Sequence, residues 1–119
     1  MEARLIVYSL CLACGVATAA PSQKYSSDQY LRNYALAVCL AAGYEATEIK
    51  QDASASARGY FEFGGYSIEA HNETVQLAKT FLKREYLSES GQPLTLMKCI
   101  DFSHSKELAT LMRRHLHDK

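Results

Sequence analysis

The chain has 119 residues, with 13 Lys and Arg against 13 Asp and Glu, so its formal net charge is zero. A chain of this length forms one domain at most. The balanced charge argues against a nucleic-acid partner, which usually requires a basic excess or stripe. Eight tyrosines without a tryptophan indicate a small core and an aromatic-rich surface, which favours protein partners.

The N-terminus has the features of a cleavable signal peptide. A lone basic residue near the start precedes the apolar run Leu5–Ala17, and Ala17-Thr18-Ala19 supplies the small-x-small pattern that signal peptidase accepts. The apolar run is too short for a stable membrane anchor. The alternatives are a buried N-terminal helix and a lipoprotein signal that ends at Cys14. We predict export, with residues 1–19 as the signal peptide and residues 20–119 as a single domain without membrane attachment.

Cleavage would leave Cys39 and Cys99 as the cysteines of the mature chain. In an oxidising compartment, two lone cysteines of a small domain most often pair with each other. Because the bond would close a loop of roughly 60 residues, it would stabilise the fold by about 4 kcal/mol. The alternative is a nucleophilic thiol with His71 or His104 as its partner, but an exported free thiol would soon be oxidised. We therefore predict an intramolecular disulfide.

The stretch Tyr30–Gly43 predicts a central helix that is buried on most sides. Its inward residues, at the spacing of one helical face, are Leu31, Tyr34, Ala35, Val38, Cys39 and Ala42. Leu36 and Leu40 lie on the opposite side, so other helices should pack on more than one side. Ser26 and Gln29 fit a capping box at the start, and the final glycine is a usual C-terminal signal.

A second helix is predicted to begin at Thr47, which can serve as its cap. Its predicted inward residues are Ile49, Ala53, Ser56, Tyr60 and Phe63. The stretch Asp52–Gly59 is rich in small residues, which let two helix axes approach closely, so we expect a tight crossing against the central helix. A serine-based active site is the alternative, but no base lies at a recognisable spacing. Gly64-Gly65 ends the pattern.

A third helix is predicted from about Ser67 to Tyr86. Its predicted inward residues are Ile68, His71, Val75, Ala78, Leu82 and Tyr86, and the opposite face is charged. Most such charged faces are simply solvated, so no site follows from this one. His71 lies at the edge of the apolar stripe, where we expect a packed histidine rather than a ligand.

Ser88–Pro93 is the clearest turn signal in the chain. The apolar segment Leu94–Phe102 follows and carries Cys99. We predict a buried short helix here because strict alternation is absent, with a strand as the alternative.

The last predicted helix is capped by Ser103 or Ser105. Its predicted inward residues are Leu108, Leu111, Met112 and Leu116. His115-x-His117 does not predict a metal site, because the two side chains point apart on a helix and no further ligands complete the set. The sequence therefore predicts an all-α fold, a compact bundle of four to five helices with one intramolecular disulfide, and indicates neither catalytic residues nor a cofactor.

Three stretches together resemble a known family. They are Asn33–Leu40, Asp52–Ala57, and Lys98–Phe102 followed by Ser105–Leu108. Their order and spacing are similar to those of the fourth family of immunity proteins against type VI secretion system amidases. The resemblance implies a small, helical, periplasmic homodimer that is not an enzyme. It also implies occlusion of the catalytic cleft of a cysteine peptidase-like amidase that cuts peptidoglycan stem peptides.

An inhibitor of this kind needs a rigid scaffold with a protruding element that enters a concave site. The candidate element consists of Ser88, Glu89, Ser90, Gly91 and Gln92, whose polar groups can hydrogen-bond a catalytic Cys–His pair. Glycine and the following proline limit the conformations of this segment. An ordinary solvated connector is the alternative interpretation.

Two other classes of function compete with this one. A periplasmic acid-stress chaperone can also be small, helical and dimeric, but the four histidines of this chain offer only a weak acid trigger. A small envelope hydrolase with Cys99 or a serine as nucleophile is the third class. A closed disulfide would argue against the thiol version of that hydrolase.

Overall fold

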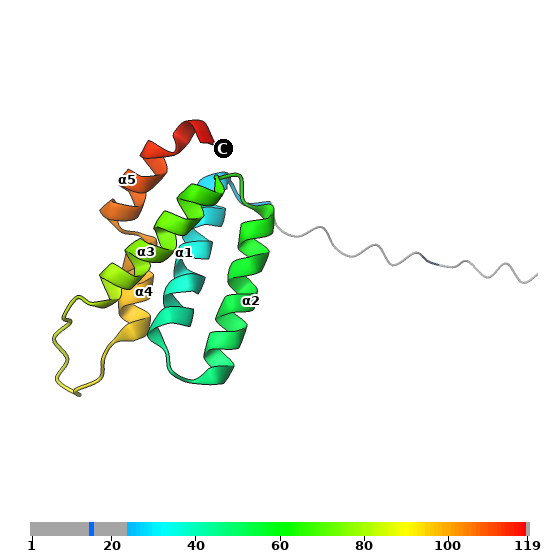
Figure 1. Cartoon of the computed structure of the whole chain (residues 1–119). Coiled ribbons are helices and arrows are strands. Elements are labelled where there is room, and N and C mark those ends of the chain that lie inside the picture. The colour runs from blue at the N-terminus through cyan, green and yellow to red at the C-terminus, as the bar shows by residue number, and fades with distance from the viewer. Residues whose placement is uncertain (1–14, 16–23, 119) are drawn as a thin grey trace, which may run out of the picture.

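The computed structural model describes Gly15 and residues 24–118, and this part of the chain is all-helical (Figure 1). Its elements are α1 (Ser27–Gly43), α2 (Thr47–Phe63), α3 (Ile68–Leu82), α4 (Thr95–Ser103), α5 (Lys106–Arg114) and a final 3-10 turn, η1 (Leu116–Asp118). The predicted all-α class is confirmed. Among the described residues, the helices lack the combination of length and apolar character that a bilayer-spanning segment requires. The predicted signal peptide, residues 1–19, lies outside the described residues apart from Gly15.

α1 lies at the centre of the bundle and packs against α2, α3 and α4. The predicted capping box is confirmed: the Gln29 amide donates to Ser26 Oγ at 3.2 Å, and the Ser26 amide donates to Gln29 Oε1 at 2.9 Å. Its buried residues are Leu31, Ala35, Ala37 and Cys39. Ala42, predicted to face inward, is exposed in the last turn. Ala37, outside the predicted stripe, is buried because α2 covers that side of α1.

Small side chains form the contact face that α2 presents to α1. Ala53 and Ala57 are the buried residues of α2. The residues of the predicted inward stripe that are instead exposed are Ile49, Ser56 and Phe63. Alanines four residues apart let the two helices approach closely, so the larger side chains remain at the edges of the contact. The predicted Thr47 cap is wrong, because Ala46 is the N-cap and makes no side-chain hydrogen bond.

Gly43 and Gly59 differ in what surrounds them. A Cβ atom at Gly43 would lie 2.5 Å from Thr95 Cγ2 and 2.9 Å from Leu82 Cδ2, whereas a Cβ atom at Gly59 would meet nothing within 4 Å. Gly43 is thus needed for close packing of the α1 end against α3 and α4, and not for a left-handed turn. The small size of Gly59 contributes nothing to the crossing of α1 and α2.

This contrast predicts opposite effects of the same substitution. Gly43→Ala is expected to lower the free energy of unfolding by about 1–3 kcal/mol, because the new methyl group overpacks a filled site. Gly59→Ala, the matched control inside α2, is expected to raise it by about 0.5–1 kcal/mol through helix propensity. Urea denaturation of both variants measures the difference, and equal effects would contradict the packing role of Gly43.

α3 begins as predicted, since Ser67 Oγ accepts a hydrogen bond from the Ala70 amide at 3.1 Å. It ends at Leu82, before the predicted end at Tyr86. The buried residues of α3 are Ala70, His71, Thr74, Ala78 and Phe81. Ile68, predicted to face inward, is 63% exposed. The buried face is rotated from the predicted one because the Phe81 ring packs against Phe102 of α4, with ring centroids 5.5 Å apart.

The chain after the turn is helical, which confirms the predicted helix in place of the alternative strand. Ser105 caps α5, since its Oγ accepts a hydrogen bond from the Leu108 amide at 3.1 Å. Leu108, Leu111 and Met112 are buried as predicted. Leu116, also predicted to face inward, is 52% exposed because α5 ends at Arg114 and Leu116 belongs to the 3-10 turn.

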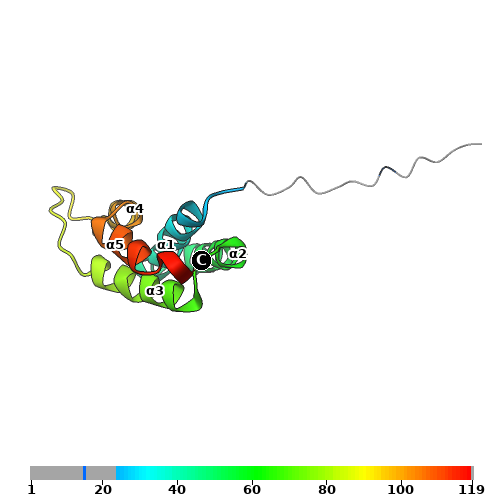
Figure 2. The same ribbon diagram turned by 90° about the horizontal axis from the view of Figure 1, so that it is seen from above.

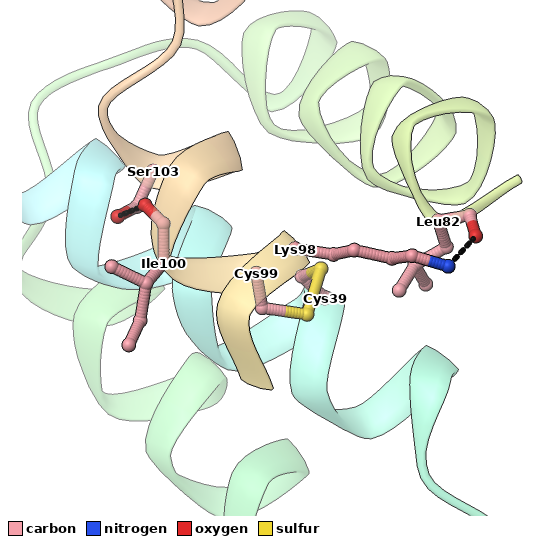
Figure 3. Close-up of a disulfide and its surroundings, with 6 residues drawn as sticks. All are labelled: Cys39, Leu82, Lys98, Cys99, Ile100 and Ser103. Carbon is pink, nitrogen blue, oxygen red and sulfur yellow. Dashed lines mark hydrogen bonds between the residues drawn. A yellow bond between two sulfur atoms is a disulfide. The ribbon is translucent and has the colours of Figure 1, made fainter. Parts of the chain in front are cut away.

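The predicted Cys39–Cys99 disulfide is confirmed, and it joins α1 to α4 (Figure 3). The two Cα atoms are 5.4 Å apart, and 60 positions separate the cysteines in the sequence. Both side chains are fully buried within the core. The bond therefore fixes the position of α4, the short helix into which the preceding loop leads.

Candidate functional site

Residues 83–94, here called the connecting loop, join α3 to α4 and project from the helical body (Figures 1 and 2). Both views show this segment standing clear of the helices. Leu87 is 99% exposed, and Glu89 to Pro93 are exposed as well. The predicted turn at Ser88–Pro93 is confirmed as the outer part of this loop, so the candidate partner-binding residues lie together at its outer end.

The outer end of the loop is organised by a few local hydrogen bonds. The Gly91 amide donates to the Ser88 carbonyl at 3.3 Å, and Gly91 adopts a φ of 74°, which suits a residue without a Cβ. The Ser88 and Ser90 hydroxyl groups lie 2.9 Å apart, and the Gln92 amide lies 3.4 Å from Ser90 Oγ. This arrangement leaves Glu89 exposed at the projecting end as its one carboxylate.

Apolar side chains lie exposed next to the loop. Leu96 and Met97 in the first turn of α4 are 52% and 50% exposed, and Ile100 follows on the same helix. The predicted burial of Leu94–Phe102 holds for only one face of α4, which turns Cys99 and Phe102 toward the core. A shallow hollow of about 340 Å³ lies beside them, lined by Tyr44, Gln92, Pro93, Leu94, Thr95, Leu96 and Met97. Exposed apolar groups around a polar loop are typical of a protein-binding surface.

The disulfide excludes the alternative site, in which a cysteine thiol acts as a nucleophile. The sulfur atoms of Cys39 and Cys99 are bonded to each other, so the described residues contain no free thiol. The nucleophilic-thiol hypothesis, with His71 or His104 as the base, is wrong for this structure.

His71 is a packed histidine, as predicted, and is only 2% exposed. Its Nδ1 lies 2.8 Å from the Ser67 carbonyl oxygen and donates to it. The ring makes edge contacts with Tyr34 and Phe61, at centroid distances of 4.6 Å and 4.7 Å. Burial lowers the pKa of His71, although the Ser67 hydrogen bond opposes that shift. The ring is therefore neutral and structural at neutral pH.

His115 joins the C-terminal turn to α3. Its Nδ1 lies 2.7 Å from Asp118 Oδ2, its Nε2 lies 3.1 Å from Glu73 Oε1, and Arg114 pairs with the other Glu73 oxygen at 2.9 Å. The hydrogen bond to Asp118 and then that to Glu73 raise the pKa of His115 against the opposing effect of desolvation. Across the described residues, no group of three or more His, Cys, Asp or Glu side chains is arranged to hold a metal ion.

The raised pKa of His115 gives a pH-dependent prediction. A group whose pKa is raised on folding adds stability below its unfolded pKa, and that stability is lost as pH rises through the folded pKa. His115→Gln should therefore lower the free energy of unfolding more at about pH 5.5 than at about pH 9. His117→Gln, an exposed control two residues away, leaves the pairs of His115 with Asp118 and Glu73 in place and should change the free energy of unfolding little in chemical denaturation. A pH-independent loss for His115→Gln would contradict the ionic role of His115.

Comparison with solved structures gives close relatives of this fold. The chain is similar to one in the structure of the effector–immunity system Tae4/Tai4 from Salmonella typhimurium, with 36% identity and a TM-score of 0.75, covering 86% of this chain and 100% of that one. It is also similar in fold to a chain in the Enterobacter cloacae Tae4–Tai4 complex, with 20% identity, a TM-score of 0.71, and 79% and 96% coverage. A chain in the complex of Salmonella typhimurium Tae4 with Enterobacter cloacae Tai4 gives 20% identity, a TM-score of 0.71, and 79% and 97% coverage.

Comparison of the sequence with family models assigns the chain to one family. No curated protein matches it. The model of the family Tai4, described as type VI secretion system amidase immunity protein, matches residues 29–112. This range runs from the first turn of α1 into α5, so it spans the disulfide and the connecting loop. The chain belongs to the Tai4 family of type VI secretion system amidase immunity proteins.

Proposed function

We propose that this protein binds a Tae4-type peptidoglycan amidase effector in the periplasm and covers its active site, so that the producing cell is protected. The observation that carries the proposal is the likeness, at 36% identity over 86% of the chain, to a chain of the Salmonella typhimurium Tae4/Tai4 effector–immunity system. The N-terminal segment with signal-peptide features supports export to the compartment where such an amidase would act.

The connecting loop is the element that we propose to enter the amidase cleft. Its outer end projects from the body and carries the Glu89 carboxylate together with the hydroxyl groups of Ser88 and Ser90. A carboxylate can accept a charge-assisted hydrogen bond from a catalytic imidazolium, which would also block substrate access. Leu87 and Met97 are exposed beside the polar end and would supply the apolar contact area that such an interface needs.

An inhibitory role without catalysis is consistent with the chemistry of the described residues. The two cysteines are consumed by the disulfide, and His71 is packed between aromatic rings. We also propose a homodimer, which the family resemblance implies. The exposed side chains of Phe61, Phe63 and Ile68 near the α2–α3 connection offer apolar surface for self-association. Sedimentation equilibrium of the mature chain measures the oligomeric state.

The proposed function is tested with purified residues 20–119 and three amidases. These are Tae4 from Salmonella typhimurium, Tae4 from Enterobacter cloacae and any amidase encoded beside this gene. Tae4 from Salmonella typhimurium is a suitable first probe because it forms a solved complex with Tai4 from another species. We expect binding and loss of peptidoglycan cleavage with at least one of them, together with protection of cells that export it. Failure with all three would overturn the proposal, and holdase activity that appears only in acid would favour the chaperone.

A further inference from the structure

Contacts from α4 hold the N-terminal end of the connecting loop. The Lys98 ammonium donates to the Leu82 carbonyl oxygen, the last of α3, at 3.3 Å (Figure 3). The same ammonium lies over the ring of Tyr86, 5.6 Å from its centroid. The Tyr86 hydroxyl donates to Asp101 Oδ2 at 2.8 Å. The N-terminal end of the loop is thus tied to the helix into which its C-terminal end leads.

The contacts at the N-terminal end of the loop and the backbone conformation at its C-terminal end each have a physical explanation. The last carbonyl groups of a helix have no partner within it, so Lys98 satisfies one at the end of α3 and adds a favourable positive charge there. Desolvation and the hydrogen bond to Asp101 raise the pKa of Tyr86, which therefore remains a protonated donor. Leu94, before α4, has a φ of 52°, an unfavourable conformation for a residue with a Cβ. Such a backbone persists only where the surrounding structure holds it.

Residues 98–102 of α4 make two sets of contacts, one with the core and one with the connecting loop. Cys99 and Phe102 are three residues apart and face the core, where Cys99 is bonded to Cys39 of α1. Lys98 and Asp101 are also three residues apart, and both reach toward the loop side of α4. The disulfide fixes α4 to the central helix, and α4 in turn fixes the loop.

We propose that Tyr86, Lys98 and Asp101 are positioning residues that hold the connecting loop in its binding conformation and so strengthen amidase binding. The inference rests on the proposed function, because the loop is the element taken to enter the amidase cleft. A loop that is already ordered loses less conformational freedom on binding, so more of its contact energy is expressed as affinity. None of the three residues needs to touch the amidase for this effect.

The test uses Lys98→Met, Tyr86→Phe and Asp101→Leu, which remove the hydrogen-bonding groups with little change in side-chain size. Lys79→Met and Tyr60→Phe remove the same charge and the same hydroxyl on α3 and α2, away from these contacts. Lys98→Arg keeps a cationic donor. Each variant is measured for its Kd against Salmonella typhimurium Tae4, or against whichever amidase the wild type inhibits. Backbone order parameters of residues 85–93 are measured by NMR relaxation in the free protein, and thermal unfolding reports the fold.

We expect Lys98→Met, Tyr86→Phe and Asp101→Leu to lower the loop order parameters and to raise Kd by about tenfold, with the helices intact. Lys98→Arg should recover most of the affinity, and the two control variants should match the wild type. Weaker binding with unchanged loop order would overturn the proposal, because it would indicate direct contact with the amidase. Unchanged binding with a more mobile loop would overturn it as well.

Failure of the proposed function can be distinguished from failure of the inference about the positioning residues. If the wild type binds none of the amidases, the proposed function is wrong, whereas the order parameters of the free protein still decide whether the three residues hold the loop. Unchanged order parameters in all three variants would show that they do not.

Discussion

Replacing both cysteines with alanine, in the double variant Cys39→Ala, Cys99→Ala, is expected to lower the free energy of unfolding by about 4 kcal/mol. The disulfide joins residues 60 positions apart, so it removes a large closed-loop entropy from the unfolded chain on the chain-entropy model. Both side chains are fully buried, and the two lost sulfur atoms also leave unfilled space in the core. The whole net stability of a domain this size is about 5–15 kcal/mol, so the effect is large.

Urea and thermal denaturation of the oxidised wild type and the double variant measure this loss. The melting temperature is expected to fall by about 15–30 °C, from the usual scaling for a domain of this size. Wild-type protein unfolded in the presence of a reductant serves as the matched control and should resemble the double variant. A loss below about 1 kcal/mol would show that packing of α4 alone holds it in place, and the entropic account would then be wrong.

Replacing Glu89–Gln92 with a glycine-serine segment of the same length is expected to weaken amidase inhibition at least about tenfold. The variant removes the carboxylate and the amide side chain and loosens the turn, while the chain ends stay in place. Global stability should change by less than about 1 kcal/mol, because this segment is exposed and contributes nothing to the core. Inhibition of peptidoglycan cleavage and thermal unfolding are measured on the same preparation.

A matched pair of single substitutions identifies the part played by charge. Glu89→Ala removes the carboxylate at the projecting end, and Glu45→Ala removes another exposed carboxylate, from the α1–α2 connection. Only the first should weaken inhibition. Full inhibition by the glycine-serine variant would show that the loop is not needed for inhibition. The amidase would then have to bind another exposed surface of the bundle.

The features that the sequence predicted correctly are those with local causes. The capping box at Ser26 and Gln29, the cap at Ser105 (one of the two predicted) and the turn at Ser88–Pro93 each depend on residues a few positions apart. Helical periodicity likewise depends on neighbouring turns, which is why the all-α class was predictable. The Cys39–Cys99 pairing followed from counting, because cleavage of the signal peptide would leave no other cysteine in the chain.

The candidate site was predictable only in part. The polar, glycine-containing composition of Ser88–Gln92 identified the loop, because such residues favour exposed turns. The apolar residues next to it were missed, since Leu96 and Met97 look like core residues in a sequence. The outward position of α4's apolar face follows only once the disulfide and Phe102 fix its rotation.

The sequence by itself therefore determined the presence of the helices, the caps of the first and last of them, the disulfide pairing and the position of the exposed turn, because these depend on local geometry and on the count of cysteines. Only the tertiary structure decided which face of each helix is buried, why Gly43 must be small and how Lys98 reaches the end of α3. These three features depend on contacts between side chains that are far apart in the sequence. The periodicity of one helix does not indicate which residues of another helix it will contact.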